Sequence, residues 1–322
     1  MRRKLLYLLG LAALIGATYV FVGRDFDSEL FMESFRSIRP LWIGASVIAV
    51  FVSYVLRAVR WRTLLKPLKL VHLTSLVSAT VLGFAAIYAV GRAGEVVRPI
   101  WVARQEGIPV TGSFASIVVE RVFDTLMILA LLAIGLSANR VSGGAEDTVA
   151  LLSRAAWLLL FVCLSVLAMF AFSHRYVDKI AARIPFQNVQ NVFEAFTRGA
   201  GPLSEPKNMV IITAHSVVVW TVVALQFWLM LIGLNLNITL PTACLVLAVS
   251  ALGSLAQIPG IGGGFQAAFV FSTTTFLSVP TETAVAAALL AWLITYIPTL
   301  TVGGLYMLWK GISTSDLVEE GS

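Results

Sequence analysis

The chain has 322 residues, of which 58% are hydrophobic and 12% are charged, and its mean hydropathy is +0.89. A water-soluble protein of this length could not bury so much apolar surface, which indicates an all-α, polytopic integral membrane protein. A nucleic-acid-binding protein is excluded, because the 23 Lys and Arg residues, against 17 Asp and Glu, form no basic run with interleaved aromatic residues.

Six segments are long and apolar enough to be predicted as full membrane spans. The first follows the basic sequence MRRK and resembles a signal peptide, but the length of its apolar run and the lack of an A-x-A cleavage site favour a retained span. Two further regions, 71–90 and 240–280, are apolar but rich in glycine and hydroxyl residues. The six predicted spans are residues 5–22, 41–56, 113–136, 151–172, 209–232 and 284–309.

The distribution of Lys and Arg between the connecting segments predicts which of them face the cytoplasm. The N-terminus and the segments 57–70 and 173–208 are basic, whereas acidic residues outnumber basic ones in 23–40 and 137–150. The N-terminus is therefore expected in the cytoplasm, and both ends of the region 71–112 are expected there as well.

This topology favours two re-entrant helical hairpins. Residues 71–90 would enter the membrane, turn at 91–94 and leave through 95–108. Residues 240–258 would enter from the opposite side and turn at 259–264. In the alternative topology these apolar segments all cross the membrane completely, which conflicts with the charge distribution.

The two hairpins would give the chain halves of opposite orientation, 41–136 and 209–309, joined by the spans and loop of 137–208. This plan is compatible with the inverted repeat of many transporters, in which broken helices meet near the midplane of the bilayer. The whole chain, 1–322, is thus predicted to form a single transmembrane domain that ends in a polar tail at 311–322.

The turn of the first hairpin, GRAGEVVRP, places charged residues next to glycines. Irregular backbone survives at membrane depth only where it is buried in protein or lines a wet cavity. The free N–H groups of two half-helices would favour an anionic group there, and arginines can bind phosphate in a bidentate manner. The candidate residues for binding a lipid head group at the two turns are Arg92, Gly94, Glu95, Arg98, Pro259, Gly260, Gly262, Gly263 and Gln266.

The span 113–136 adds three charged residues to this set. Glu120 and Asp124 are four residues apart and share a helix face, and Arg121 can pair with Asp124. Charges inside a span are costly and usually functional. Together the turn and the span supply three cations and three anions, and this balance predicts a closed network that an anionic ligand opens. The six residues are Arg92, Arg98 and Arg121 and Glu95, Glu120 and Asp124. The alternatives are an ordinary cytoplasmic loop at the first turn and a structural ion pair in the span.

The sequence predicts no catalytic residue, metal site or cofactor. Cys163 and Cys244 lie in separate apolar runs, and His72, His174 and His215 lack the spacing of metal ligands. Without a nucleotide-binding motif, transport would be passive or coupled to an ion gradient.

The motifs GRAGEVVRP, ERVFD about 25 residues later and PGIGGGFQAAF resemble those of the lysylphosphatidylglycerol synthase transmembrane-domain family. The resemblance covers roughly residues 5–312. In the third motif Ile261 and Gln266 stand where the family pattern has glycine and glutamate, so this chain lacks that carboxylate.

The resemblance implies a flippase-like protein that moves an anionic or modified phospholipid or glycolipid between leaflets, in the inner (plasma) membrane of a prokaryote. It implies no enzymatic activity for the chain itself, and a separate lipid-modifying enzyme as partner. Two alternatives stay open. One is a membrane enzyme or accessory acting on a polyprenyl phosphate or glycolipid, and the other is a non-catalytic partner subunit.

Overall fold

The computed structural model describes residues 26–138, 146–181, 190, 201, 205–258 and 262–311. The predicted span 5–22 and almost all of the predicted tail at 311–322 lie outside these residues. The described chain is helical apart from one short antiparallel pairing, in which Gln257 faces Gly263 and Ile258 faces Gly262. Its elements are α2 (Ser28–Arg36), α3 (Pro40–Leu65), α4 (Leu73–Val90), η1 (Gly91–Val96), α5 (Val97–Glu106), α6 (Val110–Ala138), α7 (Glu146–Ala181), α9 (Pro206–Gly233), α10 (Leu240–Gly253), η3 (Ser254–Ala256), β1 (Gln257–Ile258), β2 (Gly262–Gly263), α11 (Gly264–Leu277) and α12 (Thr281–Lys310).

Four of the described helices, α3, α7, α9 and α12, each contain a segment that is long and apolar enough to cross a membrane. Each contains one predicted span, and the predicted span 113–136 lies in α6, which has 29 residues. The predicted end of the second span is wrong. Helix α3 runs on to Leu65, so Arg57 and Arg60 belong to this helix and not to a loop at 57–70.

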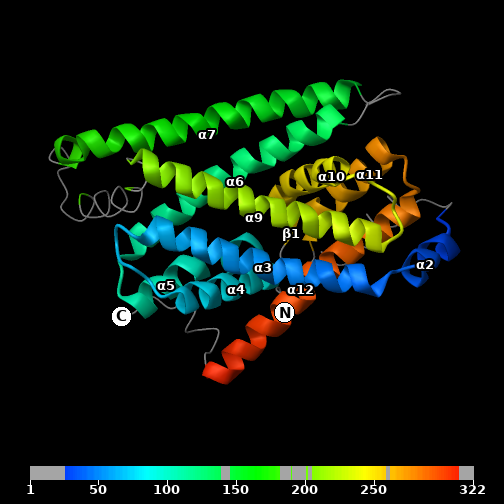
Figure 1. Cartoon of the computed structure of the whole chain (residues 1–322), viewed down its shortest axis with the longest axis horizontal. Helices are drawn as coiled ribbons and strands as arrows, with labels where there is room; N and C mark the ends of the chain where they lie inside the picture. Colours follow the sequence, from blue (N-terminus) through cyan, green and yellow to red (C-terminus); the bar gives the residue numbers. More distant parts are fainter. Residues whose placement is uncertain are drawn as a thin grey trace, which may run out of the picture.

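Helices α3 and α9 lie side by side as an antiparallel pair (Figure 1). Near one end of the pair, the Ser46 hydroxyl donates a hydrogen bond to the carbonyl oxygen of Gln226 at 3.0 Å. Near the other end, Arg60 Nη1 donates to Ser216 Oγ, also at 3.0 Å. The residue numbers on the two helices run in opposite directions, so these helices have opposite orientation.

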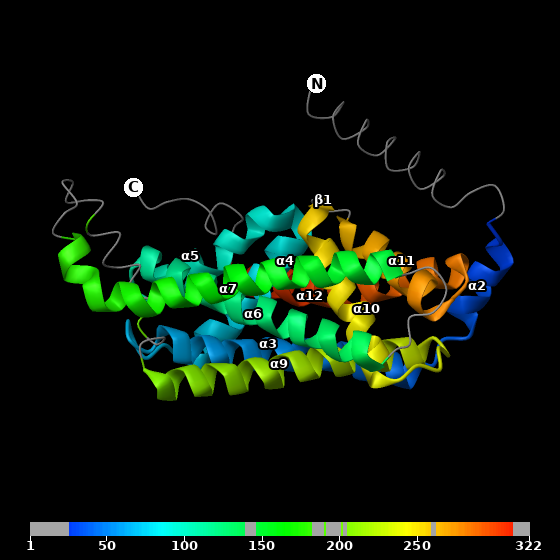
Figure 2. The ribbon, with the colours of Figure 1, turned by 90° about the horizontal axis from the view of Figure 1, so that it is seen from above.

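Two helical hairpins pack against this pair. Helix α4 folds back on η1 and α5, and α10 folds back on α11. The first turn is tight because Gly91 has a φ of 74° and a Cβ on Gly94 would lie 2.3 Å from the Ala86 carbonyl carbon. The first turn, η1, contacts β1, the strand that precedes the second turn. Figure 2 shows β1 near the middle of the long axis, on the side away from α9.

Each hairpin also packs against the last helix of the other half. Helix α4 contacts α12, and α10 contacts α6. Both contacts are close because a glycine faces the partner helix. A Cβ on Gly303 of α12 would lie 2.7 Å from Ala85 Cβ, and a Cβ on Gly135 of α6 would lie 2.6 Å from Leu245 Cβ. The halves 41–136 and 209–309 therefore make corresponding contacts.

These glycines allow a paired test of the packing. Gly303→Ala and Gly135→Ala should lower the unfolding temperature in detergent, because overpacking costs roughly 1–3 kcal/mol. Gly304→Ala is the control, since nothing lies within 4 Å of its Cβ position and alanine is favoured over glycine in a helix. Equal unfolding temperatures for Gly303→Ala and Gly304→Ala would contradict the close approach of α12 and α4.

Candidate functional site

The candidate site is built around two carboxylates on α6, Glu120 and Asp124. Glu120 is fully buried and Asp124 is nearly so. Arg60 of α3, itself fully buried, lies between them. Its Nη1 is 2.8 Å from Asp124 Oδ1, and its Nη2 is 3.3 Å from Glu120 Oε1. One guanidinium thus joins the two carboxylates and fixes α3 against α6.

Three further arginines surround the same carboxylates. Arg98 of α5 donates to Glu120 Oε1 at 2.6 Å, and Arg57 of α3 lies 3.3 Å from Asp124 Oδ2. Arg121 of α6 lies 3.3 Å from Glu120 and 3.7 Å from Asp124. Arg121 is the most accessible of these cations, with a side chain that is 39% exposed. The four arginines and two carboxylates are called the charge cluster below.

Aromatic residues enclose the charge cluster. Trp220 Nε1 of α9 donates to Asp124 Oδ1 at 2.9 Å. The Arg98 guanidinium lies over the Trp61 ring, 4.1 Å from its centroid, and Arg57 lies near the rings of Trp220 and Phe84. Arginine is suited to such a site because its planar, weakly hydrated head stacks on aromatic faces.

The charge cluster differs from the predicted balance of three cations and three anions. The structure brings Arg98, Glu120, Arg121 and Asp124 together but adds Arg57 and Arg60, which the sequence analysis had assigned to a loop. The side chain of Arg92 lies outside the described residues. The sequence signal for the buried arginines of α3 is helical periodicity. The buried face of this helix continues beyond the apolar run and includes Tyr54, Arg57, Ala58 and Trp61.

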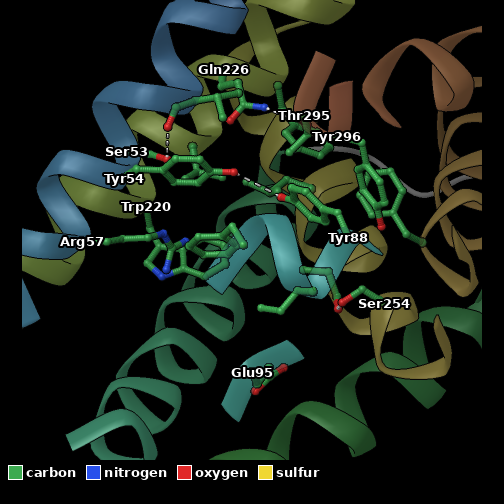
Figure 3. Close-up of a pocket in the computed structure, with 18 of the residues that line it drawn as sticks. Ser53, Tyr54, Arg57, Tyr88, Glu95, Trp220, Gln226, Ser254, Thr295 and Tyr296 are labelled. Carbon is green, nitrogen blue, oxygen red and sulfur yellow. Dashed lines mark hydrogen bonds between the residues drawn. The ribbon is translucent and has the colours of Figure 1, made fainter. Parts of the chain in front are cut away.

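A cavity of about 230 Å³ opens beside the charge cluster (Figure 3). Arg57, Arg121 and Glu95 are its charged lining residues, so Glu95 of the first turn faces the cavity as the sequence suggested. Counting Glu95, four cations stand against three anions among the side chains that the structure describes. Both halves of the chain contribute to the wall. Its other polar or aromatic lining residues are Ser53, Tyr54, Phe84, Tyr88, Trp220, Gln226, Phe227, Ser254, Phe265, Thr295 and Tyr296.

The second turn contributes to the site differently from what the sequence suggested. Gln266 Oε1 accepts a hydrogen bond from the Gly263 N–H at 2.7 Å, so this side chain caps the start of α11. Gly263 has a φ of 103°, and Gly262 pairs with Ile258. Ser254 and Phe265 of this hairpin line the cavity. Pro259 and Gly260 lie outside the described residues, and Gly94 packs on α4.

The charge cluster has buried polar atoms whose hydrogen-bonding capacity is not used within the described chain. They include Nε and Nη2 of Arg98, Nε of Arg121 and Oε2 of Glu120. In the part of the chain that the structure describes, no three His, Cys, Asp or Glu side chains are grouped to hold a metal ion. The guanidinium groups of the cluster have the geometry that suits bidentate contacts to a phosphate or carboxylate.

Comparison with known proteins shows which family the chain resembles. The family model described as the lysylphosphatidylglycerol synthase TM region matches residues 7–303. A curated relative from Haloferax volcanii, named Glycosyltransferase AglD, is 26% identical over 321 residues. The match covers 88% of this chain and 51% of the relative, so the chain spans about half the relative's length.

Removal of the central guanidinium should destabilise the protein. Arg60→Gln removes the fully buried guanidinium that joins Glu120 to Asp124, and breaking a buried ion pair on one side costs roughly 3–5 kcal/mol. We expect a large fall in the unfolding temperature in detergent. Lys66→Gln, at the exposed C-terminal cap of the same helix, should leave it unchanged. An Arg60→Gln protein as stable as Lys66→Gln would show that the cluster does not hold the helices together.

Proposed function

The chain belongs to the lysylphosphatidylglycerol synthase transmembrane family, and we propose that it moves an anionic lipid between the leaflets of a membrane. It is a multi-pass membrane protein with four described helices long enough to span. The observation that carries the proposal is that, among the described side chains, the arginines of the charge cluster outnumber its carboxylates, and that two of these arginines, Arg57 and the partly exposed Arg121, line the cavity. Charges at this depth are costly, so an excess of cations beyond what ion pairing needs favours a role in binding an anion.

The arrangement supports binding of a phosphate at the charge cluster. Arg57 and Arg121 contribute both to the cluster and to the cavity wall, so a ligand in the cavity can reach them without unfolding a helix. Arg60 and Arg98 stay buried against the carboxylates and hold the site in place. A phosphate that enters the cavity would replace one of the carboxylates that Arg121 contacts. This exchange corresponds to the opening of the charged network by an anionic ligand that the sequence predicts.

The arrangement of the two hairpins supports a path for a head group through the membrane. We propose that the hairpins are re-entrant and that the halves form an inverted repeat. In support, α3 and α9 are antiparallel, η1 of the first hairpin contacts β1 of the second, and each hairpin packs on the last helix of the other half. The cavity lies where the halves join, which is where transporters of this plan bind substrate. The acyl or prenyl chains of the lipid would stay in the bilayer.

A second candidate function is an accessory role for an enzyme that modifies lipids. The observation that favours it is the curated relative, which is named a glycosyltransferase and is about twice as long as the matched region. In that reading the chain, itself no enzyme, presents a lipid to a separate partner protein. A non-catalytic role without any lipid site is disfavoured by the cavity and the surplus of arginine.

The proposed location is the plasma membrane of a prokaryote, with the N-terminus in the cytoplasm. Single cysteines can test this topology in a Cys163→Ala, Cys244→Ala background, since both native cysteines are free. Met32→Cys, on α2, should react with an impermeant maleimide in intact cells. Lys66→Cys and Glu205→Cys should react only after permeabilisation, because the basic segments lie inside. All three positions are exposed, so the opposite labelling pattern would invert the topology.

Lipid movement can be tested with purified protein in vesicles. The protein should accelerate the loss of fluorescence of an NBD-labelled anionic phospholipid when dithionite is added outside. Arg121→Gln should slow this transfer at least about tenfold, since a charge-assisted phosphate contact is worth roughly 1.5–3 kcal/mol. The variant should still fold, because Arg121 is the most accessible cation of the cluster.

The control is Arg154→Gln, which removes an exposed arginine from α7. It should transfer lipid at the wild-type rate. A folded Arg121→Gln protein with wild-type transfer would overturn the site assignment. If wild-type protein moves no anionic phospholipid or polyprenyl phosphate faster than empty vesicles, the transfer function itself is wrong and the accessory role gains support.

A further inference from the structure

A single acidic side chain lines the cavity among the residues that the structure describes. It is Glu95, which belongs to the short helix η1 at the first turn and is partly buried. Figure 3 shows this side chain at the end of the cavity away from Gln226. Neither carboxylate of the charge cluster, Glu120 or Asp124, is a lining residue. A ligand in the cavity therefore meets the negative charge of Glu95 directly.

Arginines on two helices share the cavity wall with Glu95. Arg57 of α3 and Arg121 of α6 are the other charged lining residues. The Arg121 guanidinium is attracted by Glu95 as well as by Glu120 and Asp124. The part of the cavity where a phosphate would contact Arg121 is thus also the part that Glu95 faces.

A second, much smaller hollow shares this part of the wall. Arg121 and Glu95 line both spaces, whereas Arg98 lines only the smaller one. The volume of the smaller hollow, about 10 Å³, is enough for one water molecule at most. A phosphate group does not fit there. Of the two spaces, only the cavity can bring a phosphate to Arg121, and Glu95 lines that route.

A charged Glu95 and a bound phosphate must repel each other. At the effective dielectric constant of a partly buried site, two like charges in one small cavity change an affinity by about tenfold or more. The repulsion does not depend on which other groups Glu95 contacts. Replacing its carboxylate with a neutral amide adds one unit of positive charge to the wall, because every arginine remains.

We propose that Glu95 sets the strength of anion binding in the cavity by competing with the lipid phosphate for Arg57 and Arg121. The inference rests on the proposed function and adds the residue that allows the bound lipid to leave. In the empty cavity the carboxylate supplies the negative charge beside the two arginines. When a phosphate is bound, repulsion from Glu95 shortens the life of the complex. Passage through a membrane site requires such weak binding, since a ligand that is held too tightly is not released.

Binding of inorganic phosphate to the full-length protein in detergent tests this competition. Affinity is measured by tryptophan fluorescence, since Trp220 lines the cavity, and by the rise in unfolding temperature. Glu95→Gln and Glu95→Ala should each bind phosphate at least about tenfold more tightly than wild type. Glu95→Asp keeps the charge and should bind phosphate about as tightly as wild type. The control is Glu33→Gln on α2, which makes the same change in net charge at an exposed residue that does not line the cavity. It should leave the affinity unchanged.

Lipid transfer in vesicles gives the second readout. With increasing amounts of the NBD-labelled anionic phospholipid in the membrane, Glu95→Gln should reach half of its maximal transfer rate at a lower lipid fraction than wild type. Its maximal rate should be lower as well, because release of the lipid becomes limiting. A carboxylate that only stabilises the turn predicts a lower unfolding temperature without tighter phosphate binding.

The possible outcomes separate this inference from the function on which it rests. Phosphate binding that is unchanged or weaker in both neutral variants would overturn the role of Glu95, and so would tighter binding with an undiminished maximal transfer rate. If Glu95→Gln lowered the affinity for O-phosphoethanolamine but not for phosphate, Glu95 would instead bind a cationic group of the ligand. In each of these cases the anion site stands if Arg121→Gln lowers phosphate affinity. If neither wild-type protein nor the neutral variants bind phosphate, the anion site is wrong as well.

Discussion

A charged side chain inside an apolar helical domain must find a partner of opposite charge, and this constraint organises the whole fold. Glu120 and Asp124 lie one turn apart on α6, and the guanidinium of Arg60 joins them. The register of α3 against α6 is therefore fixed by ion pairs as well as by apolar packing. Trp220 of α9 and Arg98 of α5 complete the set by bonding to the same two carboxylates.

The cations of the charge cluster outnumber its anions among the described side chains. An ion pair that only holds two helices together needs one charge of each sign. Well-packed apolar residues in its place often stabilise a protein equally well or better. Here Arg57 and Arg121 reach past the carboxylates to the cavity wall. Rigid pairing on one side and an accessible guanidinium on the other give a site that is preorganised and still available to a ligand.

Much of this arrangement could be predicted from the sequence. The four-residue spacing of Glu120 and Asp124 predicted that they share one helix face, and both residues are buried. The roles of Arg57 and Arg60 were not predictable from hydropathy, because the apolar run ends at Leu56 while the helix continues to Leu65. The hydrogen bond from Gly263 to Gln266 depends on local backbone geometry that glycine-rich sequence leaves open. Contacts such as Gly303 with Ala85 join residues far apart in the chain, which periodicity cannot reveal.

The packing of each hairpin on the opposite half has a consequence for how the protein is made. Helix α10 finds its partner α6 already synthesised, but α4 must wait for α12, whose first residue, Thr281, follows nearly two hundred positions later. At ordinary translation rates this interval is roughly 10–40 s. During that time the face of α4 around Ala85 has no α12 to cover it, although Arg98 can already pair with Glu120 once α6 is present. The ion pairs of the first half are therefore available to fix the first hairpin against α6 before α12 has been synthesised.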